Sequence, residues 1–329
     1  MTTDTRQRAD RRTRGAGLRV LLVACAILGV SDRARAQAKL PDGQEAVVEE
    51  VLHLIRAFYV REVDVRALEA DARARGVDSM VRSLDAESRR YSVSDLQTRR
   101  RDTLTPPAAR MLPDRIGYLA VLEFHEHMGT ELTGALAALK RRGMRGLVLD
   151  LRGSPGGLMS ETVAVCQLFF GGGQVVVRTT GRSQSAERTW RAEGKSAYPD
   201  LPLTVIVDRQ TAAGSEIIAG ALQDHRRALV VGSRTLGKGF IQSFFVLPDG
   251  SALKLTTAIW LTPTGRHVTR SSTDSGGIVP DVDVLLSVDS EALTGAVRMK
   301  PGIDVPELIA GDSVLRAAVR VLVTARTRP

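Results

Sequence analysis

The sequence contains few of the residues that build disulfides, metal sites and aromatic binding surfaces. Of its 329 residues, two are cysteines, five are histidines and 4% are aromatic. If the chain is cleaved after Ala36, Cys166 is the only cysteine left, which excludes an internal disulfide even in an oxidising compartment. Cys166 lies in an apolar segment, so we predict a buried thiol rather than a nucleophile.

Histidine and glycine patterns also give little support for a metal or another cofactor. His125 and His127 would share a face of an extended segment, but no third ligand follows nearby. Gly156-Gly157 and the glycines beside Lys238 lack the spacing of a phosphate-binding P-loop. We therefore expect neither a metal nor another cofactor.

The positive charge is concentrated at the N-terminus. The formal net charge is +9, but residues 1–36 hold eight arginines and three aspartates, so the remainder carries only +4. Basic clusters at residues 99–101 and 140–142 are not interleaved with aromatic residues. We interpret them as solvated surface and expect no nucleic-acid partner.

Residues 1–36 are typical of a signal peptide. Six arginines between residues 6 and 19 precede an eleven-residue apolar run and the small-residue cleavage site Ala34-Arg35-Ala36. The run is too short to span a bilayer, which takes about 20 residues. We expect secretion to the periplasm or cell envelope. Lipidation at Cys25 or retention of the uncleaved segment would instead place the protein at the membrane.

The pattern of the remaining chain predicts two folded parts. Residues 37–102 form an N-terminal helical subdomain, with helices expected at 45–58 and 65–84. Strands and helices then alternate from residue 116, which predicts an α/β fold with a mostly parallel sheet and helices on both faces. The expected strands are 116–122, 146–151, 174–179, 203–207 and 228–231, and the expected helices are 130–142, 160–170 and 216–222. A β-hairpin at residues 240–259 and an amphipathic helix at 313–327 follow.

One strand-to-helix junction places an alanine where a reactive side chain would be expected. Ala213, in the sequence Thr-Ala-Ala-Gly-Ser-Glu of residues 211–216, falls at a helix N-terminus. Free N–H groups and the helix dipole there favour developing negative charge. A methyl group cannot attack a carbonyl. Thr211 and Ser215 are two residues away, and a two-residue helical step turns a side chain by about 200°, so we do not expect either to replace it.

This junction, together with Lys238 between two glycines and Gln242, resembles the C-terminal processing peptidases, or tail-specific proteases. These serine peptidases use a Ser–Lys pair supported by glutamine. The resemblance runs from about residue 117 to 284 and, more weakly, back to residue 45, and it implies a crotonase-like α/β fold. Further matching segments are residues 84–91, 149–157, 219–232, 253–258, 262–266 and 277–281, with Ala86 in place of the family's proline.

The resemblance implies a role for each matching residue. Ala213 stands at the nucleophile position, Lys238 at the general base and Gln242 at the residue that orients the lysine. A lysine acts as a base only when it is neutral, which requires burial away from anions because its ordinary pKa is about 10.4. If both lie on a strand, positions 238 and 242 share a face. The oxyanion donors would be Gly214 with Gly156 or Gly157, and the supporting positions are Glu216, Asp224 and Thr235.

Two departures from the family pattern shape the functional hypothesis. Residues 103–115 form a short linker where most relatives have a PDZ domain, and the nucleophile is missing. We expect a peptidase-like domain at residues 116–290 and a C-terminal helical segment at 291–329. The hypothesis is an inactive pseudopeptidase that binds an extended peptide or a protein C-terminal segment. The alternative is an active serine endopeptidase whose nucleophile was replaced in this sample. The terminal helices are candidates for homo-oligomer assembly.

Overall fold

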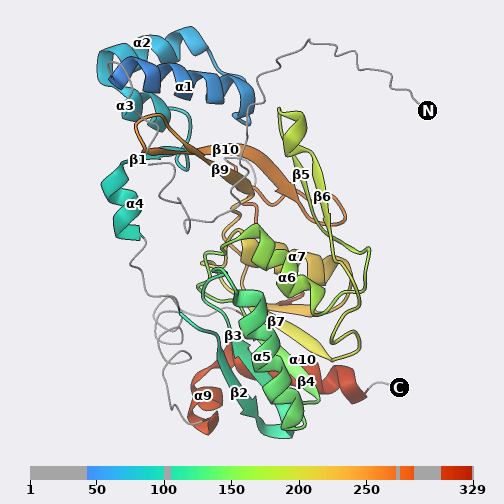
Figure 1. Ribbon diagram of the computed structural model, residues 1–329. Coiled ribbons are helices and arrows are strands. Elements are labelled where there is room, and N and C mark those ends of the chain that lie inside the picture. The colour runs from blue at the N-terminus through green and yellow to red at the C-terminus, as the bar shows by residue number, and fades with distance from the viewer. Residues whose placement is uncertain (1–42, 100–104, 272–274, 285–304, 328–329) are drawn as a thin grey trace, which may run out of the picture.

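The computed structural model describes residues 43–99, 105–271, 275–284 and 305–327 (Figure 1). The expected signal peptide lies outside these ranges. The described chain contains two sheets. The N-terminal helices lie at one end of the molecule, and the C-terminal helices lie at the other (Figure 1).

The larger sheet is the predicted parallel one. Its six strands run in the order β11-β8-β7-β4-β3-β2, and only the β2–β3 pair is antiparallel. The strands are β2 (Ala108–Leu112), β3 (Ile116–Ala120), β4 (Gly146–Asp150), β7 (Leu203–Val207), β8 (Leu229–Gly232) and β11 (Val282–Asp283). Strand β2 lies inside the range expected to be a linker. It extends the sheet by pairing with β3 and buries Leu112.

Side chains of this sheet enter two different cores. Leu149 and Val205 pack with one set of helices, whereas their neighbours Val148 and Ile206 pack with another, as the alternation of a strand requires. The first set is α5 (Met128–Arg141), α6 (Met159–Gln167) and α7 (Gly214–Asp224); the second is α9 (Val305–Gly311) and α10 (Ser313–Thr327). The predicted fold class, with helices on both faces, is confirmed.

The second sheet is antiparallel and corrects one prediction. We expected residues 174–179 in the parallel sheet, but they form β5, which pairs antiparallel with β6 and β10. A strand takes its partner from tertiary packing, and β6 was not predicted. This sheet consists of β1 (Arg89–Tyr91), β5 (Val175–Thr180), β6 (Arg188–Arg191), β9 (Phe240–Val246) and β10 (Ala252–Leu261).

The N-terminal helices pack on the β9–β10 hairpin. Val51 and Met80 share a core with Leu253 and Leu255 of β10. The expected helix over 65–84 is two helices, because Gly76 takes a φ of 85° and interrupts it. The helices of this part are α1 (Gly43–Phe58), α2 (Val65–Arg75), α3 (Val77–Arg82) and α4 (Val93–Arg99).

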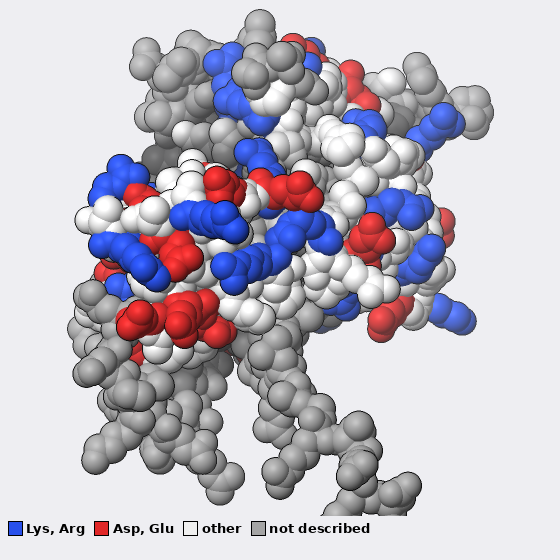
Figure 2. All heavy atoms as spheres, turned by 90° about the horizontal axis from the view of Figure 1, so that it is seen from above, with Lys and Arg blue, Asp and Glu red and all other residues white. Residues whose placement is uncertain are grey.

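Charged side chains of both signs are mixed over the end of the molecule shown in Figure 2. This face shows no large area of one charge. In the described ranges we find no helix that is both long and apolar enough to cross a membrane.

The predicted C-terminal amphipathic helix is α10, and it covers the second face of the larger sheet. Leu315, Ala318 and Leu322 are buried against β3, β4, β7 and β8. Leu322 contacts the backbone at Gly146, where an added Cβ would lie 3.0 Å from Cδ2 of the leucine. The apolar side of α10 is therefore used within the chain.

Leu322→Ala should lower the free energy of unfolding by about 2–5 kcal/mol, because it leaves a cavity between α10 and the sheet. Urea unfolding followed by circular dichroism measures this change. Arg320→Ala on the exposed side of the same helix is the control and should change stability by less than about 0.5 kcal/mol. Equal stability of the two variants would contradict the packing of α10.

Candidate active site

Ala213 lies in a strained turn between β7 and α7. Its backbone has φ 48° and ψ −115°, a conformation that a residue with a Cβ adopts at a cost of about 1–3 kcal/mol. Hydrogen bonds hold it there: Ala212 donates to the Ser154 carbonyl at 2.9 Å, and Ile217 donates to the Ala213 carbonyl at 3.0 Å. Such strain is typical of the sharp turn that presents a nucleophile at a helix N-terminus.

The predicted oxyanion glycines lie beside this turn. Both follow β4 and have positive φ angles, 92° at Gly156 and 158° at Gly157. A Cβ on Gly156 would lie 2.5 Å from the Gly214 nitrogen and 3.1 Å from the Ala213 Cβ. A Cβ on Gly157 would lie 2.2 Å from the Phe124 carbonyl oxygen. Only glycine fits at either position.

The N–H groups of Gly157 and Gly214 are the candidate pair of oxyanion donors. A Cβ on Gly214 would lie 3.4 Å from the Gly157 nitrogen, so the two backbones are in close approach. Among the described residues, neither N–H has a hydrogen-bond acceptor. Gly156 instead uses its carbonyl to accept from Phe124 at 3.0 Å and packs against the turn.

Hydrogen bonds tie the turn after β4 to the turn after β7. The Asp208 carboxylate accepts from the Gly153 N–H at 3.0 Å and from the Thr211 N–H at 2.8 Å. The Thr211 hydroxyl donates to a backbone carbonyl at 3.0 Å, and the Ser215 hydroxyl donates to the Ser154 hydroxyl at 2.7 Å. Thr211 and Ser215 are both buried. Both hydroxyls therefore donate to groups within the protein.

The Glu216 carboxylate joins this turn to the loop that carries Lys238. It is fully buried and accepts from the Ala213 and Lys238 N–H groups, both at 2.9 Å, from Gly237 at 2.7 Å and from the Thr235 hydroxyl at 2.6 Å. Burial raises the pKa of Glu216 above its ordinary value, although these bonds favour the charged form. The same carboxylate oxygen, Oε2, accepts from the N–H groups of Ala213 and Lys238. The backbone nitrogens of these two residues therefore lie no more than twice 2.9 Å apart.

The amine of Lys238 does not have the environment expected of a general base. Its Nζ lies 3.2 Å from Oε2 of Glu87, and the Nζ of Lys254 lies 3.2 Å from the same oxygen. A base needs an amine held away from anions, whereas this amine is ion-paired and partly exposed. Sequence reasoning missed Glu87. The segment 84–91 matches the family pattern, but that pattern assigns it only to the helical subdomain.

Gln242 lies on β9 opposite Thr256 of β10. Its Nε2 is buried and has no hydrogen-bond partner among the described residues. Lys238 precedes β9, which begins at Phe240, so strand alternation does not place positions 238 and 242 on one face. The structure therefore shows no hydrogen bond from this glutamine to the lysine.

Asp224 is not brought into the site. It is the last residue of α7, about 16 Å along the helix from Ala213. It accepts from the Thr264 N–H at 2.9 Å and pairs with Arg266. Burial alone would raise the pKa of Asp224, but hydrogen bonds from Thr262 and Thr264 bring it below its ordinary value. Asp224 thus fastens the loop after β10.

A buried ion cluster fixes the start of the glycine turn. The Arg152 guanidinium bonds to Asp150 and to Asp312, each at 2.6 Å, and Tyr118 donates to Asp150 at 2.8 Å. Burial disfavours the charged guanidinium, but the two carboxylates raise the pKa of Arg152 well above its ordinary value. Asp312 immediately precedes α10. No pattern in the sequence links Asp312 to Arg152.

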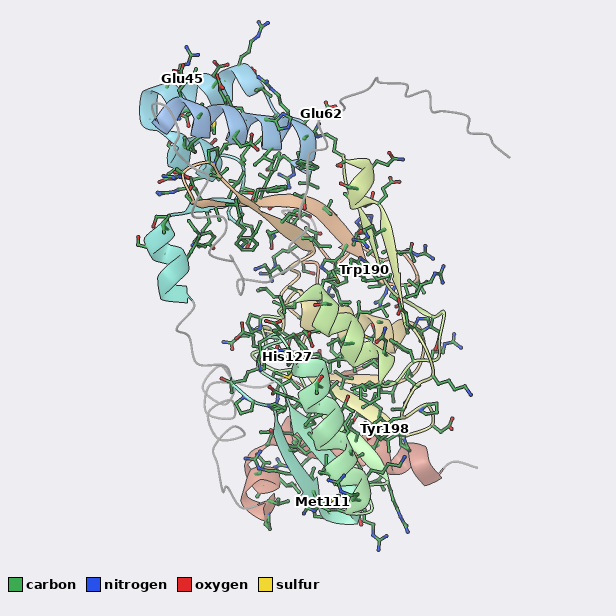
Figure 3. All side chains as sticks on the ribbon, viewed as in Figure 1. Glu45, Glu62, Met111, His127, Trp190 and Tyr198 are labelled. Atoms are coloured by element: carbon green, nitrogen blue, oxygen red, sulfur yellow. The ribbon has the colours of Figure 1, made fainter. Side chains whose placement is uncertain are left out.

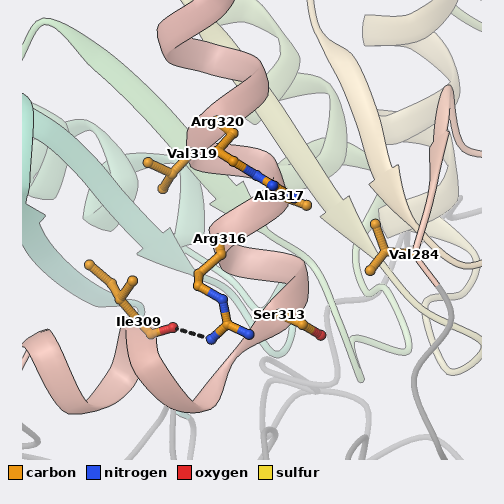
Figure 4. A pocket seen from close by; sticks show the side chains of 7 residues that line it. All are labelled: Val284, Ile309, Ser313, Arg316, Ala317, Val319 and Arg320. Carbon is orange, nitrogen blue, oxygen red and sulfur yellow. Dashed lines mark hydrogen bonds between the residues drawn. The ribbon is translucent and has the colours of Figure 1, made fainter.

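Other candidate sites in the described residues are sparse. No group of three His, Cys, Asp or Glu side chains there could hold a metal ion. His127 lies at the start of α5 (Figure 3). A pocket beside α10 is lined by residues such as Val284, Ile309 and Arg316 (Figure 4), and none of the predicted site residues lines it. Cys166 is buried, and burial raises the pKa of its thiol well above the ordinary value.

Comparison with known families matches residues 115–284 to the model of Peptidase family S41. A carboxy-terminal-processing protease of Bartonella bacilliformis is 37% identical over 173 residues, which cover 51% of this chain and 38% of that protein. A carboxyl-terminal-processing protease of Synechocystis is 37% identical over 188 residues, covering 56% and 42%. The chain thus spans less than half the length of these relatives.

Solved structures show the same fold. The photosystem II D1 C-terminal processing protease superposes with a TM-score of 0.62 at 21% identity, covering 74% of this chain and 94% of that one. A lipoprotein from Streptococcus agalactiae superposes with a TM-score of 0.61 at 17% identity, covering 77% and 96%.

Glu216→Gln should destabilise the protein by about 3 kcal/mol, because the amide turns a donor toward backbone N–H groups that need an acceptor. Thermal or urea unfolding measures the change. Glu187→Gln, an exposed position, is the matched control and should leave stability unchanged. If both variants unfold alike, the Glu216 hydrogen bonds do not hold the site together.

Proposed function

The chain belongs to Peptidase family S41, and from this membership we propose that it is a C-terminal processing peptidase-like protein that binds peptides without cleaving them. Its ligand is an extended peptide or the C-terminal segment of a protein. The relatives' names describe carboxyl-terminal processing, which requires binding of such a segment.

The observation that carries the proposal is the contrast between the preserved turn and its side chain. Ala213 keeps a strained backbone beside two N–H groups suited to an oxyanion, yet it offers only a methyl group. The neighbouring hydroxyls of Thr211 and Ser215 are buried in other hydrogen bonds. Covalent catalysis from this turn lacks its attacking atom, whereas binding of a carbonyl group does not need that atom.

An extended ligand would be held through its backbone. Strand β9 follows the Lys238 loop directly, and among the described strands it pairs only with β10. A peptide that adds to such an edge gains main-chain hydrogen bonds, and pockets for alternate side chains supply specificity. This mode would place the peptide beside the Lys238 loop, which Glu216 joins to the Ala213 turn.

The second candidate is an active serine endopeptidase whose nucleophile was replaced by Ala213 in this sample. The strained backbone at position 213 favours it, because strain of this kind usually persists for a catalytic purpose. The codon at position 213 in the genomic DNA discriminates directly. A serine codon would establish the second candidate, and an alanine codon would exclude it.

Location and assembly extend the proposal. Residues 1–36 would direct the chain to the periplasm or cell envelope. Assembly into a homo-oligomer would use the parts of the terminal helices that remain exposed, since the apolar side of α10 is buried on its own sheet.

The purified chain should bind a fluorescein-labelled extended peptide and leave it intact. Fluorescence anisotropy measures binding, and mass spectrometry of the same peptide detects cleavage. Ala213→Phe should weaken binding about tenfold or more, because a bulky side chain fills the space beside Gly156 and Gly214.

Ala74→Phe, on the exposed surface of α2, is the matched control and should bind as tightly as the unaltered chain. Two results would contradict the proposal. One is equal binding by both variants. The other is turnover of the peptide or of casein that disappears in Lys238→Ala.

Expression with export to the periplasm should yield a mature chain that begins at Gln37, because cleavage follows Ala36. Intact-mass measurement of the exported protein checks this, with Ala36→Leu as the variant that should resist cleavage. A mature protein that still contains residues 1–36 would overturn the signal-peptide assignment.

A further inference from the structure

Glu87 reaches the candidate site from the N-terminal part of the chain on a firmly held turn. The Asp85 carboxylate accepts from the N–H groups of Glu87 and Ser88, both at 2.7 Å. The Ser88 hydroxyl in turn accepts from the Thr256 N–H of β10 at 3.1 Å, and Ser88 is buried. The backbone that presents Glu87 is thereby fixed to the same hairpin that follows Lys238.

Among the described residues, Glu87 supplies the carboxylate that pairs with the Lys238 amine. Glu87 and Lys254 form one ion-paired cluster with it, in which a single carboxylate oxygen serves both amines. Glu216 also contacts the Lys238 loop, but its carboxylate already accepts four hydrogen bonds, including one from the Lys238 N–H. Asp85 is engaged by its own turn, and Arg61 stacks over Phe240 at 5.7 Å. Among these groups, Glu87 is the ion-pair partner of the amine.

We propose that Glu87 is a positioning residue that holds the Lys238 amine in its protonated, ion-paired form, so that this site lacks a working base as well as a nucleophile. This inference rests on the proposed function, because it concerns the same site. It goes further by assigning the N-terminal subdomain a direct effect on the chemistry.

The chemical reason is that a Ser–Lys site needs a neutral amine. When a serine hydroxyl attacks an amide carbonyl, its proton passes to the amine as the oxygen–carbon bond forms. The amine then gives that proton to the leaving nitrogen as the amide bond breaks, and water hydrolyses the acyl ester. An amine that is already protonated and paired with a carboxylate cannot take the first proton.

The pKa of Glu87 supports the ion pair. Burial favours the neutral carboxyl, but the charges of Lys238 and Lys254 bring the pKa of Glu87 below its ordinary value of 4.5. Because the folded-state pKa is the lower one, the stabilisation from this pair is present above pH 4.5. It disappears as the pH falls through the folded-state pKa.

The Glu87–Lys238 ion pair can be followed by NMR in the full chain after reductive ¹³C-methylation of its lysines. The sequence has only six lysines, so few methyl signals have to be assigned. The Lys238 methyl signal, assigned by its loss in Lys238→Arg, should shift as Glu87 is protonated, with an inflection below pH 4.5. Glu87→Gln should abolish this inflection. Glu69→Gln, which removes an exposed ion pair on α2, should preserve it.

The second measurement asks whether Glu87 restrains the base. Ala213→Ser restores an attacking hydroxyl, and adding Glu87→Gln should raise kcat/KM for a tailed peptide about tenfold at pH 7, because the carboxylate that pairs with the Lys238 amine is removed. The rising limb of the pH–rate profile should also move to lower pH. The combination of Ala213→Ser with Glu69→Gln should match the single variant in both respects.

The outcomes separate this inference from the proposed function. Absence of the acid inflection from the Lys238 methyl signal overturns the inference. An identical pH–rate profile for Ala213→Ser with and without Glu87→Gln also overturns it. Both results are independent of whether the unaltered chain binds peptides. If neither serine variant cleaves, the methyl signal decides alone.

Discussion

The site depends on one buried carboxylate. Glu216 accepts four hydrogen bonds, from the strained Ala213, from Thr235, from Gly237 and from Lys238. These donors come from two segments more than twenty residues apart, and most are backbone groups, so the carboxylate fixes main-chain positions rather than side chains. A buried carboxylate is costly unless its hydrogen bonds are made, and removing any one donor would leave it undersatisfied. The interaction therefore holds the turn and the lysine loop in a single arrangement.

This arrangement explains how a site can persist without its attacking atom. Neither Glu216 nor the Asp208 turn uses the side chain of residue 213, and Gly156 and Gly157 are fixed by close backbone contacts. The energetic support for the strained turn is consequently separate from the chemistry it could perform. A methyl group in place of a hydroxyl at position 213 would leave the fold and the two N–H donors intact, which is consistent with the proposed binding of a peptide without cleavage.

The N-terminal subdomain is joined to the site through β10. Its helices share a core with Leu253 and Leu255, its Asp85 turn bonds to Thr256, and Glu87 pairs with Lys238 and Lys254. Strand β10 also pairs with β9, which directly follows the loop that carries Lys238. The subdomain is thus part of the environment of the site, although it lies outside the segment that matches the family model.

The sequence by itself determined the local elements and the pattern of the site. Periodicity predicted the parallel strands and the helices on both faces. The resemblance to the C-terminal processing peptidases selected Ala213, Gly156, Gly157, Gly214, Glu216, Thr235 and Lys238, which the structure brings together. Tertiary structure decided the rest. Strand β5 pairs antiparallel with β10 rather than joining the parallel sheet, and Asp224 lies at the far end of α7 from Ala213. Gln242 makes no hydrogen bond to Lys238. The Glu87–Lys238 pair joins residues 151 positions apart, and the Arg152–Asp312 pair joins residues 160 positions apart. Local sequence sets backbone conformation and which face is apolar, whereas the partner of a charged side chain depends on how distant segments pack.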